Sequence, residues 1–351
     1  MSFIRLEKTI SAQISEAIND VTPGVQAVVY QKGKKVLDIE VGETYPYYDL
    51  ASLTKVIFTV PAMMLAFDKG LWNLKSKVSD FVPWFLHKEV LVKDVLSHSA
   101  GLVWWLPLYQ KIPIAEETLT KWYQAAELIR DCGLENKGKS VYSDVDFWVL
   151  GFVLEGLYQK PVQQIWETTK DILYAKSTLN FHKDNKPVYK SSQYAPTEQC
   201  KWRGKLLQGE VHDDNCWALD GVCTHAGLFG SLDDLGWYGL FLRSHVMSSS
   251  KLQIKSNTVK LFTSRAIDKN IGDWGLGFMK PTVGSASCGK YFSANSFGHT
   301  GFTGTSIWFD PSSDLLICVL SNRVLYGRDN KSFANLRPAI HNWIVEGLKR
   351  A

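Results

Sequence analysis

The chain has 351 residues, of which 45% are hydrophobic and 21% charged, so it has the composition of a globular protein and room for two or three structural units. Its 39 basic and 35 acidic residues leave a net charge of +4, too balanced to indicate nucleic acid or an anionic membrane as a partner. The longest apolar stretch, Val56–Phe67, contains Thr59 and Pro61 and is too short to span a bilayer.

The first residues show neither the apolar segment nor the small-residue cleavage site of a signal peptide. As the sequence stands, we expect a cytoplasmic protein, or a periplasmic one if a leader has been removed. The six cysteines form no C-x-x-C motif, so without an export signal they are expected to be free thiols, with Cys318 buried inside an apolar run.

The chain is expected to begin with a helix and a hairpin. Ile10 and Ile14 lie on one face of an amphipathic helix predicted over residues 7–20. Thr-Pro-Gly ends that helix, and two β-rich runs follow around a Gly-containing turn, which predicts strands over 25–30 and 35–41.

The middle of the chain is mainly helical, and strands return near its end. Helical periodicity or continuous apolar character predicts helices over 56–67, 92–98, 115–132, 144–158, 162–173, 231–245 and 256–263. Two apolar runs around the turn 311–314 predict a second hairpin, with strands over 306–310 and 315–321, and a helix over 335–349 ends the chain.

The distribution of strands predicts an α/β (α+β) fold in which one antiparallel sheet is built from both ends of the chain and flanked by the terminal helices. An all-helical domain is inserted between them. We place the sandwich domain at residues 1–60 and 216–351 and the helical domain at 61–215, with an active site at their junction, where ligand clefts commonly form.

Ser52 and Lys55 stand three residues apart at the start of the predicted helix 56–67, so a helical turn brings a hydroxyl and an amine onto one face. A serine hydroxyl needs an adjacent base to act as a nucleophile, and a desolvated lysine can serve. The helix N-terminus also favours negative charge. A lone S-x-x-K is more often a solvated helix face, so the rest of the chain decides.

Two later segments carry matching chemistry. In Tyr142-Ser-Asp144 the tyrosine is a candidate general acid/base, whereas the competing interpretation is a helix cap by Ser143 or Asp144. The glycine-spaced segment 297–304 is either a tightly packed bulged strand or an edge strand that pairs with a substrate backbone. In the second case the N–H groups of Ser52 and Phe302 form an oxyanion hole.

The order S-x-x-K, Y-x-[ND], [KH]-T-G resembles the serine β-lactamase and penicillin-binding-protein superfamily. It is closest to the class C β-lactamase-related branch, which includes D-alanyl-D-alanine carboxypeptidases and carboxylesterases. The resemblance covers roughly residues 7 to 348. The segments that carry it besides Tyr142–Asp144 are Asp49–Lys55, Val95–Leu102, Trp105–Tyr109, Gly209–Asp213, Thr224–Gly230 and Gly298–Thr305.

The resemblance implies an α/β sandwich with a helical domain and a serine hydrolase without metal or cofactor. Ser52 is then the acylated nucleophile, and Lys55 and Tyr142 transfer its protons. His299, Thr300, Gly301, Asp144 and Trp105 are expected to line the substrate cleft. The substrate is a small-molecule ester or a peptide ending in a D-amino acid. The alternative is a β-lactam or peptide sensor that is acylated without turnover.

Two positions depart from the family pattern. Asp144 stands where asparagine is usual, and an ionised carboxylate only accepts hydrogen bonds and keeps the proton on Lys55. His299 stands where lysine is usual, and histidine with a reference pKa of ~6.5 is mostly neutral at pH 7. Both changes predict better turnover of short aryl esters than of penicillins, and the second predicts a substrate that depends less on a carboxylate.

Two further groups leave alternatives open. His212, Asp213, Asp214, Cys216, Cys223 and His225 lie close in sequence and form either a metal site or, as we expect, a hydrogen-bonded loop over the cleft, because their spacing matches no common zinc pattern. The aromatic group Trp104, Trp105 and Tyr109 belongs either to the core of the helical domain or to an apolar wall of the cleft.

Overall fold

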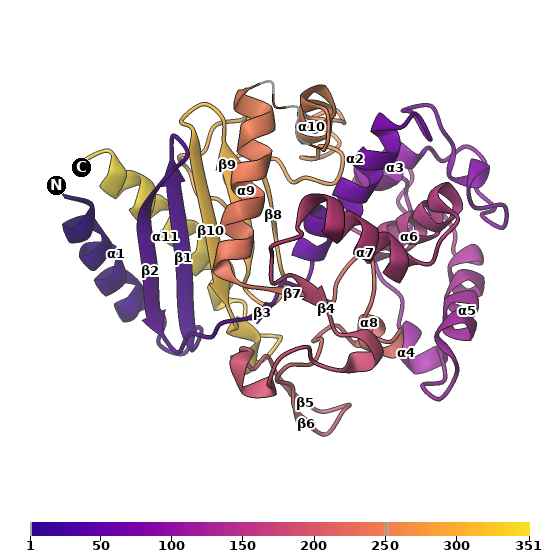
Figure 1. The fold of residues 1–351 in the computed structure, drawn as a ribbon, viewed down its shortest axis with the longest axis horizontal. Coiled ribbons are helices and arrows are strands. Elements are labelled where there is room, and N and C mark those ends of the chain that lie inside the picture. The colour runs from indigo at the N-terminus through magenta and orange to yellow at the C-terminus, as the bar shows by residue number, and fades with distance from the viewer. Residues whose placement is uncertain (1, 249, 251–252) are drawn as a thin grey trace.

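A computed structural model of the protein describes residues 2–248, 250 and 253–351 (Figure 1). Its main sheet has five strands in the order β2-β1-β10-β9-β8. Each neighbouring pair is antiparallel. The strands are β1 (Gly24–Gln31), β2 (Lys34–Gly42), β8 (Phe297–Thr300), β9 (Ser306–Asp310) and β10 (Leu315–Ser321). The predicted sheet from both ends of the chain is therefore confirmed.

The central strand β10 is buried along its whole length, which explains its unbroken apolar sequence. Successive side chains point to opposite faces of the sheet: Ile317 and Val319 join one hydrophobic core, and Cys318 joins the other. Two cores on the two faces require covering layers on both sides of the sheet.

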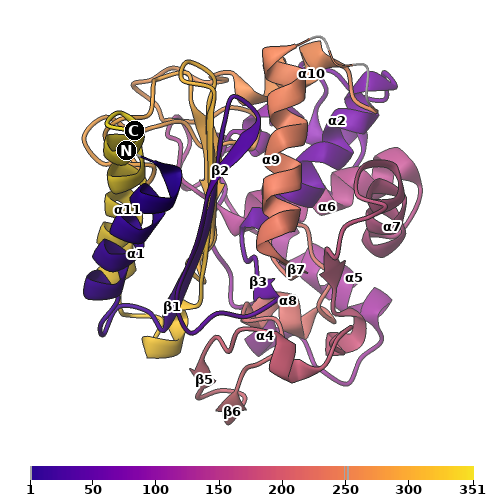
Figure 2. The same ribbon diagram turned by 60° about the vertical axis from the view of Figure 1, so that its left-hand side comes forward.

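Helices supply these layers (Figure 2). On one face α1 (Phe3–Ala17) packs beside α11 (Ser332–Leu348), and Ile10 and Ile14 of α1 are buried against the sheet. On the other face lies α9 (Leu232–Met247), which contacts β1, β9 and β10. The sheet thus separates the terminal helices from the rest of the molecule.

The remaining helices gather beyond α9. They are α2 (Val60–Asp68), α3 (Val92–Leu96), α4 (Leu108–Lys111), α5 (Thr118–Arg130), α6 (Asp144–Tyr158), α7 (Val162–Leu173), α8 (Asp214–Ala218) and α10 (Ser256–Thr263). The small strands are β3 (Tyr48–Asp49), β4 (Asn180–Phe181), β5 (Gln199–Cys200), β6 (Lys205–Leu206) and β7 (Leu228–Gly230). The domain limits near residues 60 and 215 stay a prediction.

The predicted helix 56–67 differs in its first turn, because Lys55–Thr59 form a π-helix that runs into α2. Pro61 has no N–H, so it cannot donate the α-helical bond to the carbonyl of Ile57. The hydroxyl of Tyr174 donates to that carbonyl instead, at 2.8 Å. A wide turn directly after Ser52 is therefore stabilised by tertiary contacts, which apolar periodicity does not reveal.

Other local predictions are confirmed. Ser143 caps α6, since its side chain accepts a hydrogen bond from the N–H of Asp146 at 3.0 Å. All six cysteines lie in the described ranges and are free thiols, and Cys318 is fully buried. Across the described residues, the helices are all too short or too polar to cross a membrane.

Candidate active site

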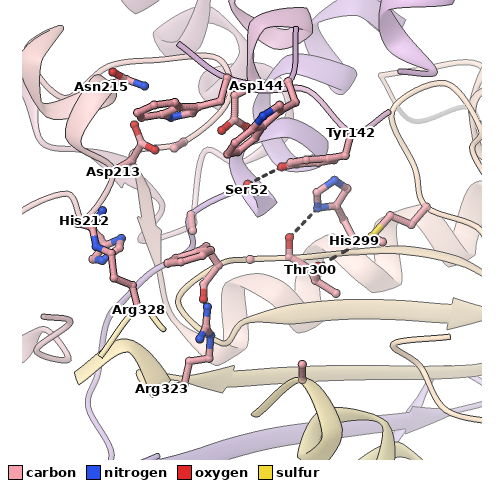
Figure 3. Close-up of a pocket in the computed structure, with 18 of the residues that line it drawn as sticks. Ser52, Tyr142, Asp144, His212, Asp213, Asn215, His299, Thr300, Arg323 and Arg328 are labelled. Atoms are coloured by element: carbon pink, nitrogen blue, oxygen red, sulfur yellow. Dashed lines mark hydrogen bonds between the residues drawn. The ribbon is translucent and has the colours of Figure 1, made fainter. Parts of the chain in front are cut away.

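A cleft of about 640 Å³ lies beside the edge strand β8. Its walls come from distant parts of the sequence: the turn at Ser52, the loop at Trp105, the start of α6, the segment 212–215, and the residues that follow β8 and β10. Figure 3 shows several of these side chains around Ser52. All the predicted site residues line the cleft except Lys55, which lies directly beneath Ser52.

The turn that carries Ser52 is held in an unusual backbone conformation. Ala51 has a φ of +46°, in the left-handed region that costs energy for a residue with a Cβ. Asp49 stabilises it: one carboxylate oxygen accepts from the N–H of Ala51 at 2.8 Å, and the other accepts from the N–H of His212 at 2.7 Å. Asp49 therefore fixes the backbone of the turn that carries Ser52.

The ammonium of Lys55 is fully buried and donates three hydrogen bonds. The acceptors are Ser52 Oγ at 3.1 Å, Asp144 Oδ1 at 2.7 Å and the backbone carbonyl of His225 at 3.1 Å. Burial lowers the pKa of Lys55, but Asp144 and Tyr142 outweigh burial, so the pKa is raised above its usual value. All three protons have acceptors, so the resting lysine is a charged ammonium.

Tyr142 approaches the same hydroxyl from the cleft side. Its O–H donates to Ser52 Oγ at 2.7 Å (Figure 3). Burial raises the pKa of Tyr142, and the opposing effect of Lys55 does not cancel that rise, so the resting side chain is a neutral phenol. Ser52 Oγ thus accepts two hydrogen bonds, which use both of its lone pairs and direct its own proton elsewhere.

A second layer of polar groups positions His225, whose backbone carbonyl accepts a hydrogen bond from Lys55. The indole N–H of Trp148 donates to His225 Nδ1 at 2.8 Å, and His225 Nε2 lies 3.1 Å from Asp213 Oδ1. Burial lowers the pKa of His225, yet Asp213 raises it to about 10, which favours the imidazolium. The hydrogen bond from Trp148 excludes the imidazolium, because an indole N–H can only donate and Nδ1 must therefore accept. His225 is accordingly neutral, with its proton on Nε2.

The wall formed by β8 is neutral at His299. Its Nδ1 donates to the carbonyl of Thr300 at 2.8 Å, and burial together with the charge of Lys55 lowers its pKa to about 3. Part of the outer edge of β8 is already hydrogen-bonded, since Met279 and Gly298 exchange two backbone hydrogen bonds at 2.8 and 3.1 Å. A substrate strand therefore finds fewer free partners along β8 than the sequence predicted.

Gly301 and Phe302 follow β8 and come close to the turn that carries Ser52. A Cβ on Gly301 would lie 2.6 Å from the carbonyl oxygen of Leu50, so only glycine permits this approach. Neither the N–H of Ser52 nor that of Phe302 donates to another residue within the described ranges. Both are free for the oxyanion that the sequence assigned to them.

The aromatic loop contributes to the cleft rather than to the core of the helical region. Trp104 and Trp105 both line the cleft, with their rings 5.8 Å apart and nearly parallel, and Trp104 is 61% exposed. Tyr109 is not part of the lining, and its ring centre lies 6.4 Å from that of Trp105. The two indoles offer an apolar surface to one side of a substrate.

Sequence reasoning missed three arginines in the same cleft. Arg328 pairs with Glu198 and Asp214, at 2.9 and 3.1 Å. Arg323 and Arg337 also line the cleft, but neither forms an ion pair with any acidic residue of the described chain. No motif marks them, because only the tertiary fold brings Arg337 to Gly301, Arg323 to Phe302 and Arg328 to Asp214.

One group in the described residues has metal-type ligands close together: Asp144, Asp213 and His225, with ligand atoms within 4.8 Å of one another. The predicted alternative of a zinc site with Cys216 or Cys223 is different, since neither thiol belongs to this group. Each of the three side chains already has a partner, and Lys55 supplies the positive charge beside Asp144. Asp144 and His225 therefore serve as hydrogen-bond acceptors for Lys55, and Asp213 holds His225.

Comparisons with known proteins agree on one family. The family model described as Beta-lactamase matches residues 6–337. A protein of Bacillus subtilis (strain 168) named N-acetylmuramyl-L-alanine amidase is 31% identical over 320 residues, which cover 80% of this chain and 69% of that protein. One of Salmonella gallinarum named as a D-alanyl-D-alanine carboxypeptidase is 30% identical over 347 residues, covering 87% and 77%.

The fold also matches a solved structure. The hydrolase EstCE1, described as having promiscuous acyltransferase activity, superimposes with a TM-score of 0.70 at 16% identity, covering 96% of this chain and 99% of that one. At that identity the likeness shows the fold alone.

Proposed function

The chain belongs to the β-lactamase family, and from this premise we propose that it is a serine hydrolase that forms an acyl-enzyme on Ser52. The observation that carries the proposal is the contact of Ser52 Oγ with both Lys55 Nζ, at 3.1 Å, and the Tyr142 hydroxyl, at 2.7 Å. No purely structural role requires a lysine and a tyrosine to converge on one hydroxyl that faces a cleft.

Acylation needs a base, and the resting site holds protons on both candidates. A proton must leave Lys55 or Tyr142 before either can accept the one from Ser52. Ser52 Oγ then bonds to the substrate carbonyl carbon, and the N–H groups of Ser52 and Phe302 stabilise the oxyanion. When the tetrahedral intermediate collapses, the bond to the leaving group breaks, and Tyr142 passes the proton from Ser52 to the leaving group. Water hydrolyses the ester to Ser52 by the same route.

An ester or amide carbonyl fits this chemistry. The relatives named amidase and carboxypeptidase support cleavage of amide bonds, and the fold of EstCE1 is compatible with cleavage of esters. The carbonyl of Thr300 accepts a hydrogen bond from His299, and the backbone N–H and carbonyl of Gly298 are both hydrogen-bonded to Met279. Few backbone groups on the edge of β8 therefore remain for a peptide substrate. This favours compact substrates, and esters are the simplest of them.

The test is mass spectrometry of the intact protein after incubation with a fluorophosphonate, a p-nitrophenyl ester and a penicillin. We expect a single adduct on Ser52. Ser52→Ala should lose the adduct and reduce ester hydrolysis by at least about 10³-fold while the circular dichroism spectrum stays unchanged. Labelling of a different serine in the variant would remove Ser52 as the nucleophile.

A sensor that is acylated without turnover is the second candidate. The observation that favours it is the fully hydrogen-bonded ammonium of Lys55, which slows any step that needs a base. The two candidates differ in their time course. A hydrolase releases p-nitrophenol steadily after the first turnover, whereas a sensor releases one equivalent and stops.

A further inference from the structure

A second cavity lies in the helical part of the molecule, away from the cleft at Ser52. Its volume is about 670 Å³, and none of its lining residues also lines the cleft. Helices α5, α6 and α7, which stand beyond α9 as seen from the sheet in Figure 1, contribute to its walls. Binding sites for small molecules usually have volumes of roughly 300–1,000 Å³. The cavity is therefore large enough for a small-molecule ligand.

The walls of this cavity are fixed by close contacts. The chain at Phe81 passes so near α6 that a Cβ on Gly156 would lie 2.4 Å from the carbonyl oxygen of Phe81, so only glycine fits there. Asp220 holds α5, since it pairs with Lys121 at 2.6 Å and accepts a hydrogen bond from Thr118 at 2.6 Å. The side chain of Lys121 is buried, which shields this ion pair from water. These contacts give the cavity a defined shape.

Aromatic rings form one side of the cavity. The ring of Phe152 on α6 meets the rings of Trp84 and Trp122 edge to face, with centres 5.0 and 5.1 Å apart. Leu119 and Tyr123 of α5 line the same cavity, and their side chains are 63% and 66% exposed. Large apolar side chains that stay exposed around a cavity favour a ligand with an apolar or aromatic body.

Glu155 adds a half-buried carboxylate to this aromatic surface. It follows Phe152 by three residues on α6, so the two side chains lie on the same face of the helix. One carboxylate oxygen accepts a hydrogen bond from the N–H of Val162 at 3.1 Å, and no cation of the described chain forms an ion pair with Glu155. Burial raises the pKa of Glu155, and the hydrogen bond from Val162 offsets this rise only in part.

The charges around the cavity favour a cation over an anion. Asp220 is neutralised by Lys121. The remaining charged residues of the lining are exposed to solvent, which screens them: Lys160, Lys183 and Asp184. Glu155 is then the least screened charge of the lining, and a positively charged ligand would give it the partner that Asp220 has in Lys121.

We propose that this cavity binds a small organic cation, an amine whose ammonium group pairs with Glu155 and whose apolar body lies against the rings of Trp84 and Trp122. An ammonium ion is attracted to the faces of aromatic rings as well as to a carboxylate, so both features of the cavity favour the same ligand. The site does not depend on the chemistry at Ser52. Asp144 and Glu155 are 11 residues apart on α6, which corresponds to about 16 Å along the helix axis.

Two ligands of the same length test the preference for a cation. They are 4-phenylbutylamine, which is an ammonium ion at pH 7, and the neutral 4-phenylbutan-1-ol. Isothermal titration calorimetry of the whole protein gives the dissociation constant of each. We expect the amine to bind about 5- to 30-fold more tightly than the alcohol. Equal dissociation constants for the two ligands, or no binding of the amine, would overturn the proposal.

Variants assign the preference to this cavity. Glu155→Gln keeps an acceptor for the N–H of Val162 but removes the charge, so the dissociation constant of the amine should rise to that of the alcohol. Tyr123→Ser shortens an exposed part of the apolar wall and should weaken both ligands. Glu127→Gln is the matched control, since Glu127 is an exposed residue of α5 that does not line the cavity.

The control should keep the full difference between amine and alcohol. A difference that survives in Glu155→Gln, or that disappears equally in Glu127→Gln, would show that the amine binds elsewhere and would overturn the site. The melting temperature of each variant, measured without ligand, should stay close to that of the wild type, because each substitution is partly or fully exposed and keeps the backbone hydrogen bonds.

Discussion

The two sides of the cleft treat charge in opposite ways. On the side of Lys55, every charged group has a partner: Asp144 lies at 2.7 Å, and Asp213 meets His225 at 3.1 Å. On the side of Arg337 and Arg323, the cations donate hydrogen bonds only to backbone carbonyls and lie over the rings of Phe333 and Phe302. Paired charges fix protonation states and positions, whereas a buried cation without an ion pair bears a desolvation cost that no opposite charge offsets. We name the side that contains Ser52 and Lys55 the reacting side, after its proposed role, and the side that contains Arg337 and Arg323 the binding side.

Removing the lysine should have the largest effect on the paired side. Lys55→Met is expected to lower kcat/KM for a neutral ester by about 10²- to 10⁴-fold, because the proton relay loses its amine. It also leaves Asp144 partly buried beside an apolar chain, so the melting temperature should fall. The double variant Lys55→Met, Asp144→Asn serves as the control. It should recover the melting temperature but not the activity, and recovered activity would show that the lysine only balances the carboxylate.

Asp144→Asn should change the pH dependence rather than abolish activity. The carboxylate raises the pKa of Lys55, so its removal lets the lysine lose its proton at lower pH. The rising limb of kcat/KM against pH should accordingly move to lower pH. A profile measured from pH 5 to 10 for both proteins decides the matter. A limb that stays in place or moves upward would show that Asp144 does not control the pKa of the base, because this carboxylate raises the pKa of both Lys55 and Tyr142.

Trp148→Phe tests the second layer on the paired side. Without the indole N–H, Nδ1 of His225 becomes free to take a proton, which the neighbouring carboxylate of Asp213 favours. Nitrogen NMR of the labelled imidazole should show the neutral Nε2–H form in the wild type and a protonated ring in the variant at pH 7. The backbone carbonyl of His225, which accepts a hydrogen bond from Lys55, should then shift, and activity should fall about 2- to 10-fold. Trp308→Phe is the matched control, because Trp308 is equally buried but its indole N–H has no partner.

The sequence predicted the reacting side well because its signals are local or ordered. Ser52 and Lys55 are one helical turn apart, and Tyr142 precedes a helix whose cap and bounds follow from local rules. Asp144 was expected near Lys55 from the order of the motifs, and the structure places it there.

The binding side could not be predicted in the same way. Arg337 looks like any charged position on a helix, and Arg323 looks like a loop residue. Their contact with Gly301 and Phe302 arises only when α11 and the end of β10 pack against the turn after β8. The pairing of Trp148 with His225 likewise joins two segments that no spacing relates. Long-range packing, which a single sequence does not encode in any motif, decides these contacts.

The smallest expected change concerns stability, and it separates the two kinds of arginine. Arg203→Met removes a buried partner of Asp214 and should cost on the order of 3 kcal/mol in the free energy of unfolding. Arg337→Met removes a cation that has no partner and replaces it with an apolar chain of similar length. Because the desolvation cost disappears with the charge, the free energy of unfolding should stay within about 1 kcal/mol of the wild type or rise. Urea unfolding of both variants provides the measurement. A loss at Arg337 as large as that at Arg203 would mean that its bond to Gly301 holds the fold together, and the binding side would then be as structural as the reacting side.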